Sequence, residues 1–213
     1  DAGDKMYLAD YSYGTFTTAY EIGSTVKGAT LLTGYREGAV TIGTSQIDEP
    51  IVLGENLVKS SIFNRSGRIR MDDLMALEQS SNVYMFKIAM TMGGLSYYPY
   101  IGIASLLRDD TLQRLRNGYA QVGLGVPTGV DLPGETAGVI GVPDSPGKVL
   151  DITIGQFDTY TPLQLVQYVS TIANGGYRVQ PRLLKEIRKP SKDGQTLGPL
   201  VKEIEPNILN QLD

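Results

Sequence analysis

The chain has 213 residues, of which 41% are hydrophobic and 20% charged, so it is long and apolar enough to bury a substantial core. One domain is the default, with two small lobes as the alternative. Its 19 basic and 23 acidic residues give a net charge of −4 without a run of like charges, which argues against nucleic acid as a partner. The chain has no Cys and no His, so we expect neither a metal nor a cofactor, and acid–base chemistry must use Lys, Asp, Glu or Tyr.

The first third of the chain predicts one helix between extended segments. Residues 7–20 are rich in Tyr and Thr around a glycine, which favours extended chain or a short hairpin. Small and apolar residues from Ser24 to Thr33 follow helical spacing and predict a buried helix that ends at Gly34. Glycines and a proline divide residues 35–70 into short β-favouring runs such as 39–42, so we expect loops and small strands there.

Two consecutive helices are predicted in the middle of the chain. Asp72 is a plausible N-cap for a helix that continues to Ser80, and a second helix starts at Ser81 or Asn82 and ends at residues 93–94. Ser80 and Asn82 should therefore lie at a helix junction. Because Ser and Asn are favoured N-caps, this position also has a purely structural explanation.

The second half predicts two further helices and a strand. A helix is expected over residues 110–120, followed by an irregular segment at 123–135 that is rich in Gly and Pro. Thr161 is the predicted N-cap of the strongest helix, with Pro162 in its first position and Gln164 completing a capping box. This helix should end at residues 174–176, before a strand at 179–188 and a turn at 192–195 that leads into a second run.

Ser24 and Lys27 are candidate catalytic residues because residues three apart share a helix face. A serine hydroxyl is a poor nucleophile until a neighbour takes its proton, and a lysine does so only when burial or nearby positive charge lowers its pKa. The spacing alone is a weak signal, and a capping serine beside a solvated lysine is the alternative. Ser145 and Lys148 repeat the spacing across Pro-Gly, which we interpret as a surface turn with no supporting site.

Further short motifs accompany these residues, so that the motifs together lie at residues 20–27, 78–85, 123–125, 128–135, 154–156 and 161–165. Together they resemble the transpeptidase domain of class B penicillin-binding proteins. They occur in that family's order between roughly residues 20 and 185, and their agreement is more specific than either short motif. The segment 155–160 and the Tyr-rich start look most like the division-associated 2B type of Gram-positive bacteria.

The resemblance implies a serine D,D-transpeptidase with an α/β (α+β) fold like that of the serine β-lactamases. Ser24 would attack the penultimate D-Ala of a peptidoglycan stem peptide, with Lys27 as the base directly or through Ser80. Asn82 would hold the donor amide, and β-lactams would acylate the same serine. Ser81 and Gln156 would contribute to substrate binding. The identity of the acylating base is disputed in related serine enzymes, so Lys27 is assigned from its spacing.

The resemblance also implies parts that this chain does not contain. The family carries a Lys-Thr-Gly strand after the region that matches residues 179–188, and sheet strands and a membrane anchor before the match. We therefore expect residues 1–213 to be a helix-rich central segment, truncated, cleaved or completed by a second chain, with part of an antiparallel sheet.

The cellular setting follows from the same resemblance. The segment itself is expected to be soluble, because it has no stretch of roughly 20 apolar residues and no signal peptide or lipidation motif at residues 1–5. Its parent would be anchored at the extracytoplasmic face of the bacterial cell membrane, with cell-division proteins as possible partners. A penicillin-recognising sensor or scaffold without turnover, and a serine β-lactamase of related fold, are the alternative functions.

Overall fold

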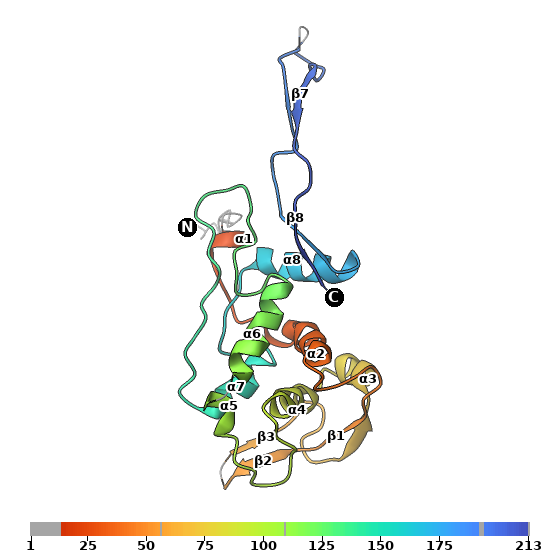
Figure 1. The fold of residues 1–213 in the computed structure, drawn as a ribbon, viewed down its shortest axis with the longest axis vertical. Coiled ribbons are helices and arrows are strands. Elements are labelled where there is room, and N and C mark those ends of the chain that lie inside the picture. The colour runs from red at the N-terminus through yellow and green to blue at the C-terminus, as the bar shows by residue number, and fades with distance from the viewer. Residues whose placement is uncertain (1–13, 56, 109, 192–193, 213) are drawn as a thin grey trace, which may run out of the picture.

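A helical body with a projecting β-arm makes up the computed structural model, which describes residues 14–55, 57–108, 110–191 and 194–212 (Figure 1). Each strand named below pairs with one antiparallel partner: β1 with β4, β2 with β3, β5 with β8 and β6 with β7. The helices are α1 (Gly14–Thr17), the 3-10 helix η1 (Gly23–Val26), α2 (Lys27–Arg36), α3 (Asp73–Glu78), α4 (Asn82–Met92), α5 (Ser105–Arg108), α6 (Thr111–Gln121), α7 (Pro146–Ile152) and α8 (Pro162–Ala173). The strands are β1 (Gln46–Asp48), β2 (Ile51–Gly54), β3 (Leu57–Lys59), β4 (Ile69–Met71), β5 (Tyr177–Val179), β6 (Glu186–Arg188), β7 (Leu200–Glu203) and β8 (Ile208–Gln211).

Helix α4 forms the centre of the core. Eight of its eleven residues are buried, and it packs against α2, α6, α7 and β1. A helix that is apolar on nearly every side is stable only when other elements surround it. At the contact with α2, a Cβ on Gly34 would lie 2.8 Å from the Ile88 side chain, so glycine permits the close approach of the two helices. Gly34 therefore serves packing, and α2 continues past the predicted stop to Arg36.

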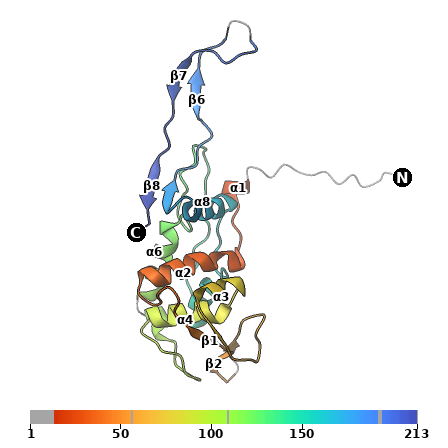
Figure 2. The ribbon, with the colours of Figure 1, turned by 90° about the vertical axis from the view of Figure 1, so that its right-hand side faces the viewer.

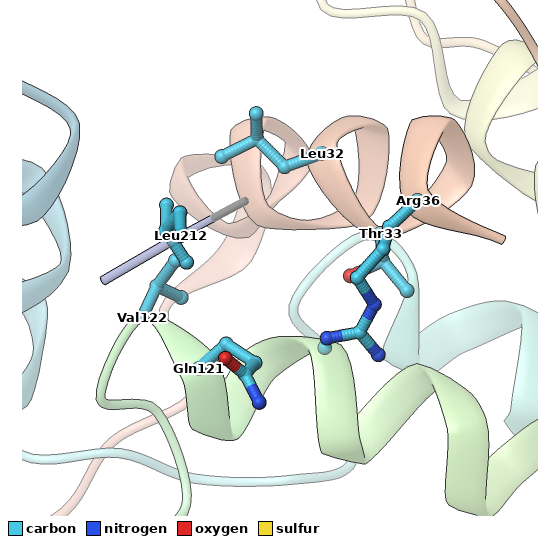
Figure 3. Close-up of a pocket in the computed structure, with 7 residues that line it drawn as sticks. Leu32, Thr33, Arg36, Gln121, Val122 and Leu212 are labelled. Atoms are coloured by element: carbon cyan, nitrogen blue, oxygen red, sulfur yellow. The ribbon is translucent and has the colours of Figure 1, made fainter. Parts of the chain in front are cut away.

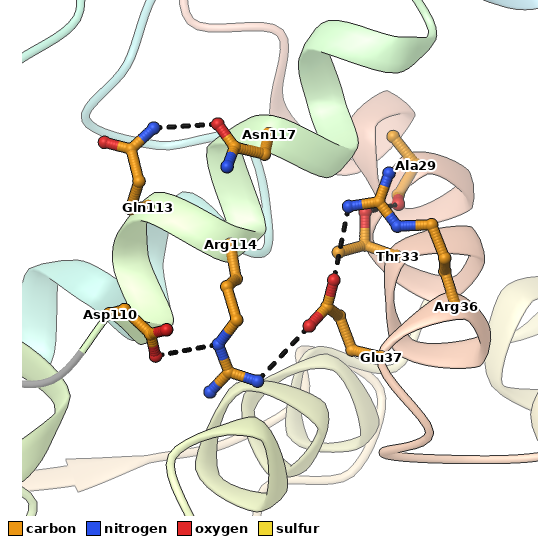
Figure 4. Close-up of polar contacts among 8 residues, drawn as sticks. All are labelled: Ala29, Thr33, Arg36, Glu37, Asp110, Gln113, Arg114 and Asn117. Atoms are coloured by element: carbon orange, nitrogen blue, oxygen red, sulfur yellow. Dashed lines mark hydrogen bonds and ion pairs between the residues drawn. The ribbon is translucent and has the colours of Figure 1, made fainter.

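A polar clamp joins α2 to α6 (Figure 4). The Arg114 guanidinium on α6 donates hydrogen bonds to Asp110 on one side and to Glu37, just after α2, on the other. It also reaches the Met92 carbonyl at the end of α4. A single side chain thus fixes the ends of three helices, because the guanidinium presents several donors in a rigid plane.

The groove between α2 and α6 is partly filled by the end of the chain (Figure 3). Leu212, which follows β8, lies close to Leu32 on α2 and to Val122 just after α6. The Leu212 amide donates to the Gly176 carbonyl at 2.9 Å, which holds this end beside the start of β5. The segment after α8 therefore turns back onto the helical body.

The β6–β7 pair extends away from the helical body as an arm, as both views show (Figures 1 and 2). Every residue of β7 is exposed, and apolar side chains such as Leu200 and Val201 face solvent. Helix α8, at the base of the arm, packs against α1 and β5 but leaves Val166 and Val169 more than half exposed. This end of the molecule has a thinner core than the region around α4.

Most of the predicted helices are confirmed, together with their caps. The Asp72 side chain accepts a hydrogen bond from the Met75 amide, which starts α3 where expected. Thr161 and Gln164 form both hydrogen bonds of the capping box, at 2.8 and 3.2 Å. Helices α4 and α6 also begin within a residue or two of the predicted positions. Residues 123–135 are irregular as predicted.

Several local predictions are wrong. Residues 14–17 form α1 in place of extended chain, while residues 7–13 lie outside the described part. Residues 39–42 form no strand, although small strands follow from residue 46. The strand expected over 179–188 is two short strands, β5 and β6, separated by residues 180–185. Residues 192 and 193 of the predicted turn are not described, and β7 follows it.

Residues 146–148 belong to α7, so the segment expected to be a surface turn is a helix start. Ser145 precedes α7 as its N-cap residue, and Pro146 occupies the first helical position, where it removes no hydrogen bond of the helix. Proline is therefore compatible with this helix start, which the sequence interpretation overlooked. The Lys148 ammonium pairs with Asp144 at 2.8 Å and lies 5.1 Å from the centre of the Phe157 ring. These contacts occupy Lys148 on the surface.

Candidate active site

Ser24 lies on the 3-10 helix η1, which leads directly into α2. Its side chain is exposed, and the Lys27 amide donates to the Ser24 carbonyl, so the two residues are one 3-10 turn apart on the same face. The Gly23 amide donates to the Gly155 carbonyl at 3.0 Å. A Cβ on Gly155 would lie 2.0 Å from the Gly23 carbonyl oxygen, so glycine is required for the segment 154–156 to approach the turn that carries Ser24.

The Lys27 side chain is buried beneath this turn, with only 2% of its surface exposed. Its ammonium donates three hydrogen bonds: to the Ser80 carbonyl at 2.6 Å, to the Ser80 hydroxyl at 2.9 Å and to the Asn82 side-chain carbonyl at 2.7 Å. Burial lowers the pKa of Lys27 from its usual 10.5 to about 8, and the negative charge of Asp48 opposes this shift. A lysine with such a pKa loses its proton readily near neutral pH and can act as a base.

Ser80 lies at the junction of α3 and α4, as predicted. Its backbone φ is +54°, a left-handed conformation that is unusual for serine. The Ser80 amide donates to the Leu77 carbonyl and the Ser81 amide to the Ala76 carbonyl, which fixes this conformation. The turn directs the carbonyl and the hydroxyl of Ser80 at Lys27, so strain is stored where the polar groups converge.

Ser81, which was expected to bind substrate, lies inside the protein at the start of α4. Ser81 is fully buried, and its hydroxyl accepts a hydrogen bond from the Tyr84 amide at 2.9 Å while it donates to Asp48. The residue is therefore the N-cap of α4. Its hydroxyl faces the interior, and a role for Ser81 in substrate binding stays a prediction.

Gln156 is exposed and follows Gly155, the residue that contacts the Ser24 turn. The next residue, Phe157, has a φ of +85° and donates its amide to Glu21, just before η1. The segment 155–157 therefore lies along the chain that leads into Ser24. A role for Gln156 in substrate binding stays a prediction.

Sequence reasoning missed a buried polar network below the helix junction. Asp48 at the end of β1 is 1% exposed and accepts hydrogen bonds from Ser61, Ser81 and Asn64. These residues are scattered through a region of loops and short strands, without a periodic pattern or motif. The only available signal was the presence of Asp, Ser and Asn in residues 46–71, a segment of short strands and loops that packs on the core.

Comparison with known proteins is consistent with this geometry. The family model "Penicillin binding protein transpeptidase domain" matches residues 2–212. Penicillin-binding protein H of Bacillus subtilis is 48% identical over the whole chain, and penicillin-binding protein 2A of the same bacterium is 44% identical over 96% of it. Penicillin-binding protein 2B of Streptococcus pneumoniae is 35% identical over 97% of the chain. Identity is thus higher with H and 2A than with the 2B type.

A solved structure has the same fold. Penicillin-binding protein 2B of S. pneumoniae strain R6 superposes with a TM-score of 0.88 and 35% identity over 95% of this chain and 33% of that one. The chain belongs to the penicillin-binding protein transpeptidase family, as a transpeptidase domain of class B, and its mixed helical and antiparallel architecture is that of the family.

The match covers only part of each relative. The chain spans 28–30% of the length of penicillin-binding proteins H, 2A and 2B. In the part of the chain that the structure describes, no helix is long and apolar enough to cross a membrane. The same residues contain no group of three or more Asp and Glu side chains that could hold a metal ion.

Proposed function

We propose that this chain carries the nucleophile and the base of a serine D,D-transpeptidase that cross-links peptidoglycan stem peptides. The observation that supports this function best is the buried Lys27 amine, held by Ser80 and Asn82 one turn away from the exposed Ser24. Membership in the transpeptidase family supports the reaction class, and the contacts of Lys27 support the proposed roles.

The first half-reaction forms an acyl-enzyme. The Ser24 hydroxyl oxygen attacks the carbonyl carbon of the penultimate D-Ala, and its proton passes to the neutral Lys27 amine, directly or through the Ser80 hydroxyl. The peptide bond then breaks, and the departing terminal D-Ala takes the proton on its amine. The donor stem remains bound to Ser24 as an ester.

The second half-reaction transfers the donor to a neighbouring stem. An acceptor amine attacks the ester carbonyl and loses a proton to Lys27, and the proton returns to the Ser24 oxygen as the ester bond breaks. Asn82 would orient the donor amide from a side chain that is itself held in place: its carbonyl accepts from Lys27, and its side-chain nitrogen donates to the Ser60 carbonyl. A β-lactam would enter the first half-reaction as an analogue of the D-Ala-D-Ala end and remain on Ser24.

Labelling with a fluorescent penicillin tests this function. The longest gene product that carries this chain should become covalently labelled, and Ser24→Ala should abolish the label because the nucleophilic oxygen is lost. Ser145→Ala is the matched control, since Ser145 has the same spacing to a lysine but lies at the start of α7, and it should label like the parent. Label that survives Ser24→Ala would refute the assignment. Without the Lys-Thr-Gly strand, residues 1–213 alone should label weakly.

The lifetime and the turnover of the acyl-enzyme separate the transpeptidase from the alternatives. A penicilloyl-enzyme that persists for many minutes is expected of a transpeptidase, whereas rapid hydrolysis would indicate a β-lactamase. Release of D-Ala from a stem pentapeptide, lost in Ser24→Ala, is expected of the enzyme. Labelling without any release would indicate a sensor or scaffold.

The substrate also suggests where the reaction takes place. Peptidoglycan is cross-linked outside the cell membrane, so we propose the extracytoplasmic face as the location of this domain, with an anchor elsewhere in its parent protein. Fractionation of cells followed by penicillin labelling of the membrane fraction would test this location. A label confined to the cytosolic fraction would contradict it.

A further inference from the structure

The buried carboxylate of Asp48 contacts the junction between α3 and α4 through the hydroxyl groups of Ser61 and Ser81. One oxygen of its carboxylate accepts the hydroxyl protons of Ser61 and Ser81, each at 2.5 Å, and the other accepts from the Asn64 side chain at 2.8 Å. A carboxylate accepts hydrogen bonds and does not donate them, so both serine protons must point at Asp48. The lone pairs of the two serine oxygens are consequently turned away from it.

Those lone pairs accept the first amides of α4. The Ser61 oxygen accepts from the Asn82 amide at 2.9 Å and the Val83 amide at 3.2 Å, and the Ser81 oxygen accepts from the Tyr84 amide at 2.9 Å. These are the backbone donors that a helix start leaves without a partner inside the helix. The carboxylate thus fixes the orientation of two hydroxyls, and the hydroxyls fix the start of α4.

The start of α4 carries the groups that hold Lys27. Ser80, which precedes Ser81, supplies a carbonyl and a hydroxyl to the Lys27 ammonium, and Asn82, which follows Ser81, supplies its side-chain carbonyl. Two hydrogen bonds connect Asp48 to Lys27 by way of Ser81 and the adjoining Ser80. Three connect them by way of Ser61 and Asn82. A small shift of reacting groups can cost about a hundredfold in rate, so the placement of this turn matters.

We propose that Asp48 is a positioning residue of the active site, which acts through Ser61 and Ser81 to hold Ser80 and Asn82 against Lys27. The inference rests on the proposed function of Ser24 and Lys27. It adds a residue that does not touch Lys27 itself and that comes from β1, the strand that follows α2 in the sequence.

An asparagine in place of Asp48 cannot substitute for the carboxylate, although it has the same shape. Asn64 is locked by its loop, because its side-chain oxygen accepts from the Gly67 amide at 2.8 Å and its nitrogen faces the Gly67 carbonyl and Asp48. Either orientation of the side-chain amide in Asp48→Asn therefore places a donor against a donor, at Asn64 or at the two serines. The substitution disturbs the network without opening a cavity.

The charge of Asp48 also affects the pKa of Lys27, so the pH dependence of the reaction can test the proposal separately from protein stability. Among the described residues, Asp48 on β1 is the charged group that raises the pKa of Lys27, and the helix junction presents only neutral groups to it. Tyr168 on α8 and Tyr119 on α6 contact α2 near Gly28 and Thr30, and burial raises the pKa of both, which keeps them neutral below pH 10. Loss of the Asp48 charge should therefore lower the pKa of Lys27.

The test compares Asp48→Asn with Asp73→Asn in the longest gene product that carries this chain. Asp73 is an equally buried carboxylate that accepts hydrogen bonds from the Tyr35 hydroxyl and the Gly43 amide and does not act on Lys27. Acylation by a fluorescent penicillin is followed from pH 5.5 to 9.5. The acylation rate should rise with pH to a plateau, and the rising part at low pH is called the acidic limb. Asp48→Asn should lower the plateau rate by about tenfold or more and move the acidic limb to lower pH. Asp73→Asn should leave the position of that limb unchanged.

Two results would overturn the proposal. An Asp48→Asn protein with the parent's plateau rate would show that the network does not position the site. A slower protein whose acidic limb stays in place, or a limb that moves equally in Asp73→Asn, would assign Asp48 a structural role only. Absence of label in the parent, or label that survives Ser24→Ala, is a failure of the proposed function and is recognised separately.

A second pair of variants keeps the proposal testable if Asp48→Asn does not fold. Ser81→Ala removes one of the two intermediate hydroxyls and leaves the carboxylate, whereas Ser81→Thr retains the hydroxyl. The plateau rate should fall about tenfold in Ser81→Ala and recover in Ser81→Thr, with the acidic limb unchanged in both. An equal rate in Ser81→Ala and the parent would contradict the positioning role.

Discussion

Replacement of Lys27 by methionine should change the pH dependence of folding stability. Burial holds the pKa of Lys27 at about 8 in the folded protein, against 10.5 when the side chain is solvated. Between these two values the unfolded chain binds more protons than the folded one, so stability rises as pH rises through this window. Each unit of pKa difference corresponds to about 1.4 kcal/mol, so the buried amine costs roughly 3.4 kcal/mol at pH 7 and roughly 1.4 kcal/mol at pH 9.5.

The measurement is the free energy of unfolding in urea, followed by circular dichroism at pH 7 and pH 9.5 for the parent and for Lys27→Met. Relative to the variant, the parent should gain about 2 kcal/mol between these two pH values. Loss of the donor to Ser80 and Asn82 adds an offset that is the same at both pH values and cancels. Tyrosines with raised pKa values are shared by both proteins and cancel as well.

Leu31→Ala is the control, because Leu31 lies on the same helix, is 4% exposed and does not titrate. Its cost in stability, about 2–5 kcal/mol, should be the same at pH 7 and pH 9.5. A difference between the parent and Lys27→Met that is also constant over this range would show that Lys27 titrates normally. The reasoning about its burial and its role as a base would then be refuted.

Three further substitutions test the packing that supports the site. Thr161→Ala should lower the free energy of unfolding by about 1 kcal/mol through loss of the capping box of α8, and Thr161→Ser should restore most of it. Gly118→Ala would place a Cβ 2.1 Å from the Thr33 hydroxyl, so it should cost about 1–3 kcal/mol in urea denaturation, and a smaller residue at position 33 should recover part of this cost. Asp158→Asn removes the negative charge and one of the two oxygens that accept from Arg116, at 2.8 and 2.9 Å, and should cost about 3–5 kcal/mol; a loss under 1 kcal/mol would contradict the burial of this pair.

Local sequence signals predicted the helices well where the cap is a short-range hydrogen bond. Asp72 and Thr161 each accept a hydrogen bond from the amide three residues ahead, so four consecutive residues are enough to predict the contact. The same kind of reasoning failed where tertiary packing decides. Gly34 looked like a helix stop, but it lies where α2 needs a close approach to Ile88, and Ser145 looked like a turn although Pro146 is compatible with a first helical turn.

The sequence alone determined the family, because its motifs occur in that family's order. It also predicted Ser24, Lys27, Ser80 and Asn82 as the residues of the site. Only the tertiary structure decided what surrounds them. Lys27 meets Ser80 and Asn82 across 53 and 55 residues of chain, and its burial, which sets its pKa, is a property of the packed molecule. The inward-facing hydroxyl of Ser81 and the carboxylate of Asp48 were invisible for the same reason, since no local pattern records which distant side chain a polar group will meet.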